Sequence, residues 1–168
     1  MIKTTLIGHA SMLIQSKEAT ILTDPVWFDY LWEEINVLCP SIDLNKDKIP
    51  PVDILNISHR HQDHCDVRTL AYLIQNNLIL KPDVTVLVPN DDILIDVLKE
   101  LEYKNIHVVS DFEPIELKDV TLTPTPSLNE GDNFPEHGLL VHDGEVTIWN
   151  QVDTILSPEI ISYIHKLY

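Results

Sequence analysis

Short apolar runs separated by polar or proline-containing turns dominate this amino-acid sequence. Residues 4–14 and 20–22 are apolar segments divided by Gly8 and by a polar turn at 16–18, and they predict a short antiparallel meander. The apolar run 52–57 has the length of a buried strand. Later strands are predicted at 84–88, 106–109, 114–117, 120–123, 139–141 and 146–149. The chain is therefore expected to be rich in short strands.

Apolar residues at helical spacing predict three helices among these strands. They cover 67–74, 91–101 and 158–167. The second helix begins with Asp91 and Asp92, carboxylates that suit the positive end of a helix as capping groups. Strands and helices that alternate in this way, without internal repeats, predict an α/β layered domain.

Residues 26–50 predict a long irregular connection bracketed by prolines. Its aromatic side chains are Trp27, Phe28, Tyr30 and Trp32. A connection of this length inside a compact domain is often a lid or a binding wall, and aromatic rings would suit the apolar part of a substrate. Packing of the same rings into the core is an equally open alternative.

Composition narrows the class of protein. With 168 residues and 44% hydrophobic content, one domain over residues 1–168 is expected. Twenty-seven acidic against eleven basic residues give a formal charge of -16, which disfavours nucleic acid or anionic membranes as partners by a general electrostatic route. No apolar run approaches the ~20 residues of a membrane span. Cys39 and Cys65 form no disulfide framework and no leader is evident, so a cytoplasmic setting is expected.

The strongest chemical signal is a cluster of metal-binding side chains directly after the strand at 52–57. His59, His61, Asp63 and His64 fall within six consecutive positions. Imidazole and carboxylate donors suit zinc, iron and related divalent cations. In an extended segment His59 and His61 share one side, while Asp63 and His64 can turn toward a second point, which indicates two metals. Asp63 can also orient an attacking water. The alternatives are a histidine-rich surface loop and a lone structural zinc.

The cluster resembles the first metal motif of the metallo-β-lactamase fold superfamily, His-x-His-x-Asp-His. Segments 6–14 and 21–26 look like the opening strands of the branch that contains N-acylphosphatidylethanolamine phospholipase D, ascorbate-6-phosphate lactonases and sialic-acid hydroxylase-like proteins. Residues 49–53 and Asp66 are similar to that branch as well. The resemblance implies an αββα sandwich with its metal site along one sheet edge.

The resemblance also implies roles for two aspartates far from the cluster. Asp153, followed by Thr154, matches the residue that bridges both metals in relatives, although a turn or capping role is the alternative. Asp24, in Thr23-Asp24-Pro25, corresponds to a carboxylate beneath the metal-binding histidines. Such a carboxylate fixes the tautomer of an imidazole without itself binding metal, whereas turn initiation before Pro25 is the competing role.

Other residues are candidates for the pocket. His9 could reach it from the first turn, and Asn150 could supply a neutral hydrogen bond to a ligand. The family normally supplies another histidine near the position of Ser127, and His137 is the nearest candidate, either as a replacement or as a pocket residue. Family members also continue beyond the bridging aspartate, so the chain is expected to be short at its C-terminus. A homodimer or a separate completing chain is expected to cover the open sheet edge.

These observations lead to a metal-dependent hydrolase as the expected function. One or two divalent ions, zinc first and iron or manganese as alternatives, would activate a water for attack on an ester, lactone or phosphodiester of a small molecule. A diiron redox enzyme of the same fold is one alternative. A non-catalytic protein that keeps part of the site for structure or partner binding is another.

Overall fold

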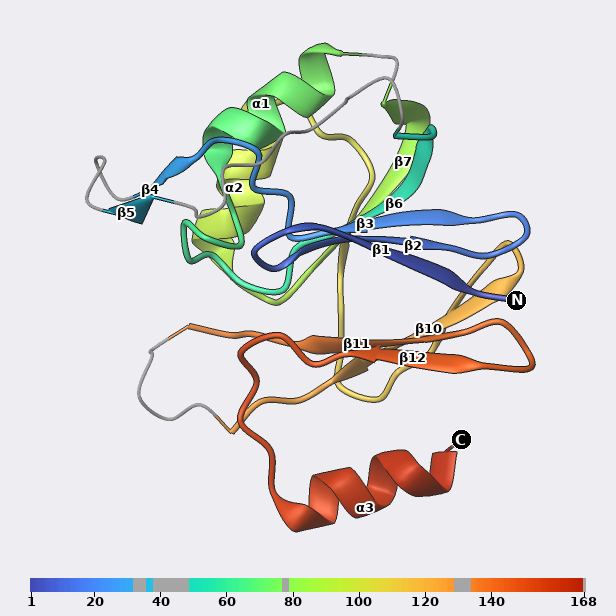
Figure 1. Ribbon diagram of the computed structural model, residues 1–168. Coiled ribbons are helices and arrows are strands. Elements are labelled where there is room, and N and C mark those ends of the chain that lie inside the picture. The colour runs from blue at the N-terminus through green and yellow to red at the C-terminus, as the bar shows by residue number, and fades with distance from the viewer. Residues whose placement is uncertain (32–35, 38–48, 77–78, 129–133, 168) are drawn as a thin grey trace.

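Two β-sheets lie face to face, with helices on their outer sides (Figure 1). The computed structural model describes residues 1–31, 36–37, 49–76, 79–128 and 134–167. The first sheet has the order β1 (Lys3–Gly8), β2 (Ser11–Gln15), β3 (Thr20–Thr23), β6 (Val52–Asn56), β7 (Leu80–Val88) and β8 (Ile106–Val108). The second has the order β12 (Thr147–Asn150), β11 (Gly138–His142), β10 (Val120–Thr125) and β9 (Ile115–Leu117).

Helices complete the layers. The helices α1 (Val67–Gln75) and α2 (Asp92–Glu100) lie together beside the first sheet, and α3 (Pro158–Leu167) lies on the far side of the second (Figure 1). The predicted αββα sandwich is therefore confirmed. Among the described residues, no helix has the length and apolar character needed to cross a bilayer.

The alternation of side chains along each strand divides the core into two parts. Leu22 and Leu55 belong to the cluster that packs the first sheet against α1 and α2. Their sequence neighbours Ile21 and Ile54 belong to a second cluster shared with the strands of the other sheet, such as Leu122. Successive residues of a strand point to opposite faces, so an apolar run such as that of β6 is buried on both sides.

Both helices on the first sheet begin with a capping aspartate. Asp66 accepts a hydrogen bond from the backbone N–H of Thr69 at the start of α1. Asp91 accepts from Ile93 and Leu94 at the start of α2. Each carboxylate satisfies N–H groups that the first helical turn leaves without a partner. The capping role predicted for Asp91 is confirmed.

A buried carboxylate ties the two sheets together. Asp53, in β6, accepts hydrogen bonds from Thr20 and from the ammonium groups of Lys81 and Lys118, and Lys118 lies between β9 and β10 of the other sheet. Burial alone would raise the pKa of Asp53, but the hydrogen bonds from Lys118 and Lys81 outweigh it and hold that pKa below its ordinary value. The contact joins the sheets at the end remote from the histidine cluster.

Two predictions differ from the observed elements. The strand expected at 84–88 begins at Leu80 and passes through Pro82, where the register with β6 shifts; such an irregularity tolerates a residue without an N–H. The connection 26–50 contains two short strands, β4 (Tyr30–Leu31) and β5 (Asn36–Val37). Of its aromatic residues, Trp27 is buried and Tyr30 is exposed. Trp32 lies outside the described residues.

Candidate metal centre

The histidine cluster occupies a compact loop between β6 and α1. The strand ends before the cluster, the segment bends at Arg60 and His61, and it closes in the turn expected around Asp63 and His64, with hydrogen bonds from the N–H groups of His64 and Cys65 to the carbonyl of His61. Because of this turn, His64 folds back toward His59, and their ring centroids lie 4.2 Å apart. Cys65 is a buried thiol whose pKa burial raises to about 12, so it has the character of an apolar core residue.

Two groups of donor atoms converge at this loop. His59, His61 and Asp153 form one group, and in each group all three potential ligand atoms lie within 4.8 Å of one another. Asp63 and His64 form the second group together with His9, which comes from the turn between β1 and β2. The distances among the three ligand atoms of each group suit a single cation. Imidazole nitrogen together with carboxylate oxygen is a donor set that fits zinc, iron or manganese.

Asp153 lies between the two groups. Its Oδ2 atom is 3.3 Å from Nε2 of His64 and 3.9 Å from Nε2 of His59. The turn that carries it follows β12 and is closed by Thr154, whose hydroxyl donates to the carbonyl of Gln151 at 2.7 Å. This carboxylate is therefore positioned to reach an ion in either group.

Unusual backbone conformations accompany these side chains. His9, Asp24 and Val152 all have positive φ angles, of 50°, 40° and 50°. The left-handed region costs energy for residues other than glycine, most of all for a β-branched residue such as Val152. The three residues follow β1, β3 and β12, and each turn directs a side chain to the same rim of the sandwich. Strain of this kind gathers where a site must be held in place.

Asp24 lies beneath the cluster and is completely buried. Its carboxylate accepts hydrogen bonds from the backbone N–H and the hydroxyl of Ser58, at 2.7 and 2.8 Å. It also lies 3.0 Å from Nδ1 of His64. The Ser58 hydroxyl is 2.9 Å from Nδ1 of His59. One buried carboxylate thus orients His64 directly and His59 through Ser58.

The two buried histidines have pKa values displaced in opposite directions. Burial lowers the pKa of His59, and the neighbouring His64 lowers it further. Burial also acts to lower the pKa of His64, but the hydrogen bond and negative charge of Asp24, together with Asp153, outweigh it and raise that pKa. An imidazole must be neutral to bind a metal, so metal binding at His64 has to displace a proton that the acidic neighbours favour.

The remaining candidate residues are not members of either donor group, although the backbone N–H of His137 donates to the carbonyl of Ser58 beside His59. His137 is buried, and its Nε2 atom is 2.9 Å from Oδ1 of Asn56. Ser127, at the position where a further histidine was expected, donates a hydrogen bond to Glu136. Asn150 is buried at the end of β12, and its Nδ2 atom has no partner among the described residues. None of these side chains joins His59 or His64 in a group of donor atoms.

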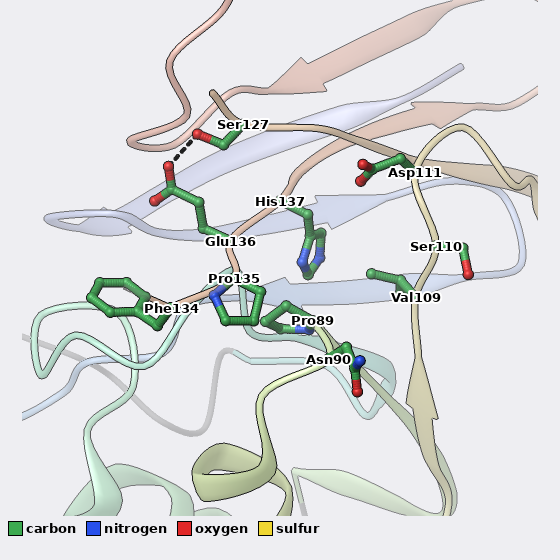
Figure 2. A pocket seen from close by; sticks show the side chains of 10 residues that line it. All are labelled: Pro89, Asn90, Val109, Ser110, Asp111, Ser127, Phe134, Pro135, Glu136 and His137. Atoms are coloured by element: carbon green, nitrogen blue, oxygen red, sulfur yellow. Dashed lines mark hydrogen bonds between the residues drawn. The ribbon is translucent and has the colours of Figure 1, made fainter. Parts of the chain in front are cut away.

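Phe134 is a site residue that the sequence did not indicate. Its ring stacks on His59 with centroids 5.8 Å apart and meets the edge of His61 at 4.5 Å. The guanidinium of Arg60 lies over the same ring, 4.9 Å from its centroid. Beyond Phe134 a cavity of about 400 Å³ opens toward His137 and Asp111 (Figure 2). An isolated aromatic residue in a loop carries no pattern that would distinguish it from a surface or core residue.

Comparison with known sequences identifies relatives along most of the chain. A family model described as "Beta-lactamase superfamily domain" matches residues 3–151. A protein of Mycobacterium tuberculosis whose name places it among Rieske 2Fe-2S iron–sulfur proteins is 29% identical over 157 residues, which are 89% of this chain and 29% of that protein. A UPF0173 protein of Pyrococcus abyssi is 27% identical over 151 residues, 90% of this chain and 60% of that protein. The chain spans less than a third of the length of the mycobacterial relatives that it matches.

Solved structures share the fold. CmlA, a diiron β-hydroxylase from Streptomyces venezuelae, superposes with a TM-score of 0.75 and 22% identity over 99% of this chain and 32% of its own. An isothiocyanate hydrolase from Delia radicum gut bacteria gives 0.73 and 18%, over 99% of this chain and 67% of its own. Identities this low demonstrate the architecture alone. The family match over residues 3–151, the αββα layers and the His-x-His-x-Asp-His loop together make this chain a member of the β-lactamase superfamily with the metallo-β-lactamase fold.

Proposed function

We propose that this protein is a metal-dependent hydrolase that uses one or two divalent metal ions, zinc first, on an ester, lactone or phosphodiester of a small molecule. The first ion would be held by His59, His61 and Asp153. The second would be held by His9, Asp63 and His64, with Asp153 within reach of both. The formal net charge of -16 agrees with a small-molecule substrate, because it disfavours nucleic acid and anionic membranes.

The observation that carries this proposal is the convergence of two three-donor groups on one rim, with Asp153 between them. A structural zinc site closes four protein ligands around one ion, whereas a catalytic site keeps an open position for water or substrate. Each group here offers three donors from the described residues. The arrangement favours a reactive site over a structural one.

Metal ions bound by such donors lower the pKa of water toward ~7 and polarise carbonyl or phosphoryl oxygens. The protein's own groups then have separate tasks. Asp63 accepts the proton of the attacking water, and its carboxylate is held by His9 at 3.1 Å. Asp24 and Ser58 keep the rings of His59 and His64 in place. Attack by water on the acyl carbon or phosphorus breaks the bond to the leaving group, which departs with a proton.

Metal content and turnover test the proposal together. Protein purified without added metal is measured by elemental analysis and assayed on p-nitrophenyl acetate, a γ-lactone and bis(p-nitrophenyl) phosphate. We expect about one to two equivalents of zinc, and loss of at least about 100-fold of turnover in His59→Ala and Asp153→Ala. The matched controls are His107→Ala and Asp83→Ala, which remove exposed side chains away from the rim. If both site variants keep metal and turnover, the site is wrongly assigned.

A diiron redox enzyme is the second candidate. One observation supports it: the structural likeness to CmlA, a diiron β-hydroxylase. Histidine and carboxylate donors bind iron as well as zinc. Iron as the metal present, with an absorption or Mössbauer signature of a coupled pair, would favour this candidate, and zinc with hydrolytic turnover would contradict it.

The setting that we propose is the cytoplasm. Cys65 is a free, buried thiol, which is typical of a reducing compartment. Localisation of a tagged protein in its own cell tests this expectation.

A further inference from the structure

The cavity beside the metal centre has a size and position that suit part of a substrate. Its volume of about 400 Å³ lies within the range of small-molecule pockets. Phe134 forms part of its wall and also touches His59 and His61, so the cavity begins one aromatic ring away from the proposed ligands. A molecule that fills the cavity would extend toward the candidate metal centre.

His137 presents an acceptor to this space. Its side chain is 1% exposed, and Nε2 lies 2.9 Å from Oδ1 of Asn56. A carbonyl oxygen can only accept, so Nε2 carries the hydrogen and Nδ1 is left with a bare lone pair. That Nδ1 atom has no hydrogen-bond partner among the described residues. In Figure 2 the ring extends into the hollow between Pro135 and Val109. A buried acceptor without a partner is costly unless a ligand supplies a donor.

Two carboxylates line the same cavity. Glu136 is 8% exposed; one of its oxygens accepts from Ser127, and the other, Oε2, has no hydrogen-bond partner in the described part of the chain. Asp111 lies at the mouth, and Figure 2 shows its carboxylate directed toward the side of His137. Figure 2 shows the Glu136 carboxylate turned toward Ser127 and away from Asp111, so His137 and Asp111 are the acceptors of the cavity and Glu136 adds a negative charge to its wall.

Positive charge is scarce around these acceptors. Among the described residues, those that line the cavity include no lysine or arginine. The nearest guanidinium identified, that of Arg60, stacks over Phe134 and is paired with Asp91 at 3.4 Å. An anionic group in the cavity would therefore face two carboxylates without compensation. An apolar group would leave the buried acceptors unsatisfied.

We propose that this cavity binds the ammonium group of a small-molecule substrate, with Nδ1 of His137 and the carboxylate of Asp111 as the acceptors and Glu136 as a second negative charge in the wall. An ammonium has hydrogen-bond donors and no acceptor, which matches a bare imidazole nitrogen and a carboxylate. The proposal rests on the proposed function in one respect: the part of the substrate that reacts would lie beyond Phe134, at the metal centre. The cavity itself selects the charged end.

The test uses metal-free protein, so that an amine cannot register by coordinating a metal. Backbone amide NMR spectra are recorded during titration with n-butylammonium, 1-butanol and butyrate, in about 0.15 M salt to screen the acidic surface. We expect n-butylammonium to shift the amides of Val109, Ser110 and His137 saturably, with a Kd at least about tenfold lower than that of 1-butanol, and butyrate to give no shift.

Variants assign the effect to the cavity. We expect Asp111→Asn to raise the Kd for n-butylammonium about fivefold or more and Glu136→Gln, which removes a charge from the wall, to raise it by a smaller factor, while Asp83→Asn, an exposed carboxylate elsewhere, leaves it unchanged. Asp111 is exposed, so its variant decides the question even if Glu136→Gln fails to fold. Equal binding of 1-butanol, no saturable shift, or an equal effect of Asp83→Asn would each overturn the proposal.

The ammonium site and the proposed hydrolase can be refuted independently of each other. If the protein binds n-butylammonium in the cavity but takes up no metal, the ammonium site stands and the proposed hydrolase falls. If metal and turnover are present but n-butylammonium does not bind, only the ammonium site falls.

Discussion

Oδ2 of Asp24 lies 3.0 Å from Nδ1 of His64, and both side chains are almost completely buried. With Nδ1 directed at the carboxylate, Nε2 of His64 faces the rim, where Asp153 lies 3.3 Å away. A carboxylate that accepts the hydrogen of one ring nitrogen fixes the tautomer and leaves the other nitrogen free for a metal. Asp24 therefore acts on the metal centre through His64.

The first prediction concerns this contact. Asp24→Asn keeps the size of the side chain but removes its charge, so His64 is less firmly held and less basic. We expect the Kd for zinc to rise about 10- to 100-fold, as is typical when a partner of a ligating histidine is lost. A competition titration with a coloured chelator measures the change. Asp83→Asn is the matched control, and circular dichroism checks that both variants fold. An unchanged Kd in folded Asp24→Asn would refute the role.

The second prediction concerns the turn between β1 and β2. His9 is the member of the second donor group that lies farthest along the chain from the others, with its Nε2 atom 3.1 Å from Asp63. Because Asp63 and His64 alone make a weak site, His9→Ala should lower the zinc content by about one equivalent in protein that otherwise holds two. Elemental analysis after gel filtration measures it. His107→Ala controls for the loss of an exposed histidine; an equal loss in both variants would contradict the assignment.

The third prediction is a pH dependence of stability. The pKa of His137 is about 4, below its ordinary value of 6.5, mainly because burial penalises the charged ring. The unfolded chain takes up this proton near pH 6.5 and the folded chain only near pH 4. The free energy of unfolding is therefore unaffected by His137 above about pH 6.5. As the pH falls from 6.5 toward 4, uptake of a proton by His137 in the unfolded chain lowers the free energy of unfolding by about 3 kcal/mol.

Urea unfolding of metal-free protein measures this linkage. Between pH 7.5 and pH 4.5 we expect the wild type to lose about 2 to 3 kcal/mol more than His137→Gln, which cannot titrate at this position. His107→Gln should follow the wild type, since that residue is exposed. If the unfolding free energies of wild type and His137→Gln change in parallel with pH, the burial of His137 does not make stability depend on pH.

The fourth prediction concerns the close packing of β10, β11 and β12. A Cβ atom at Gly138 would stand 2.5 Å from Oγ1 of Thr125 and 3.1 Å from the carbonyl oxygen of Asn150. The Thr125 hydroxyl could rotate only by giving up its hydrogen bond from Trp149, and the Asn150 carbonyl is backbone that cannot yield without moving β12. Gly138→Ala should cost about 1 to 3 kcal/mol of unfolding free energy. Because β12 leads into the turn of Asp153, metal affinity should fall as well.

Gly144 provides the comparison for that prediction. It has a φ angle of 90° but nothing within 4 Å of an added Cβ. Gly144→Asn should therefore cost only about 1 kcal/mol, all of it from the backbone conformation, since asparagine tolerates positive φ better than most residues and has open space here. Thermal and urea unfolding of the two variants measure the difference. If the two variants lose the same unfolding free energy, the steric contacts of an added Cβ do not dominate the cost of Gly138→Ala.

The parts of the site that the sequence predicted are those whose residues are close together along the chain. His59, His61, Asp63 and His64 lie in one short loop after one apolar run, and both the loop and the strand are local patterns. The spacing alone indicated two metal positions. Asp24 and Asp153 were identified by resemblance to a family, because a single aspartate before a proline or after a strand is also an ordinary turn residue.

The sequence by itself determined the layers and the histidine loop, because periodicity and ligand spacing depend on neighbouring residues. Only the tertiary structure decided which distant side chains join that loop. His9 meets Asp63 across 54 positions, and Phe134 meets His59 from the loop that precedes β11 of the other sheet. These contacts result from the packing of two sheets and from turns with positive φ angles, and no local pattern in the chain records how far apart in space two such turns will lie.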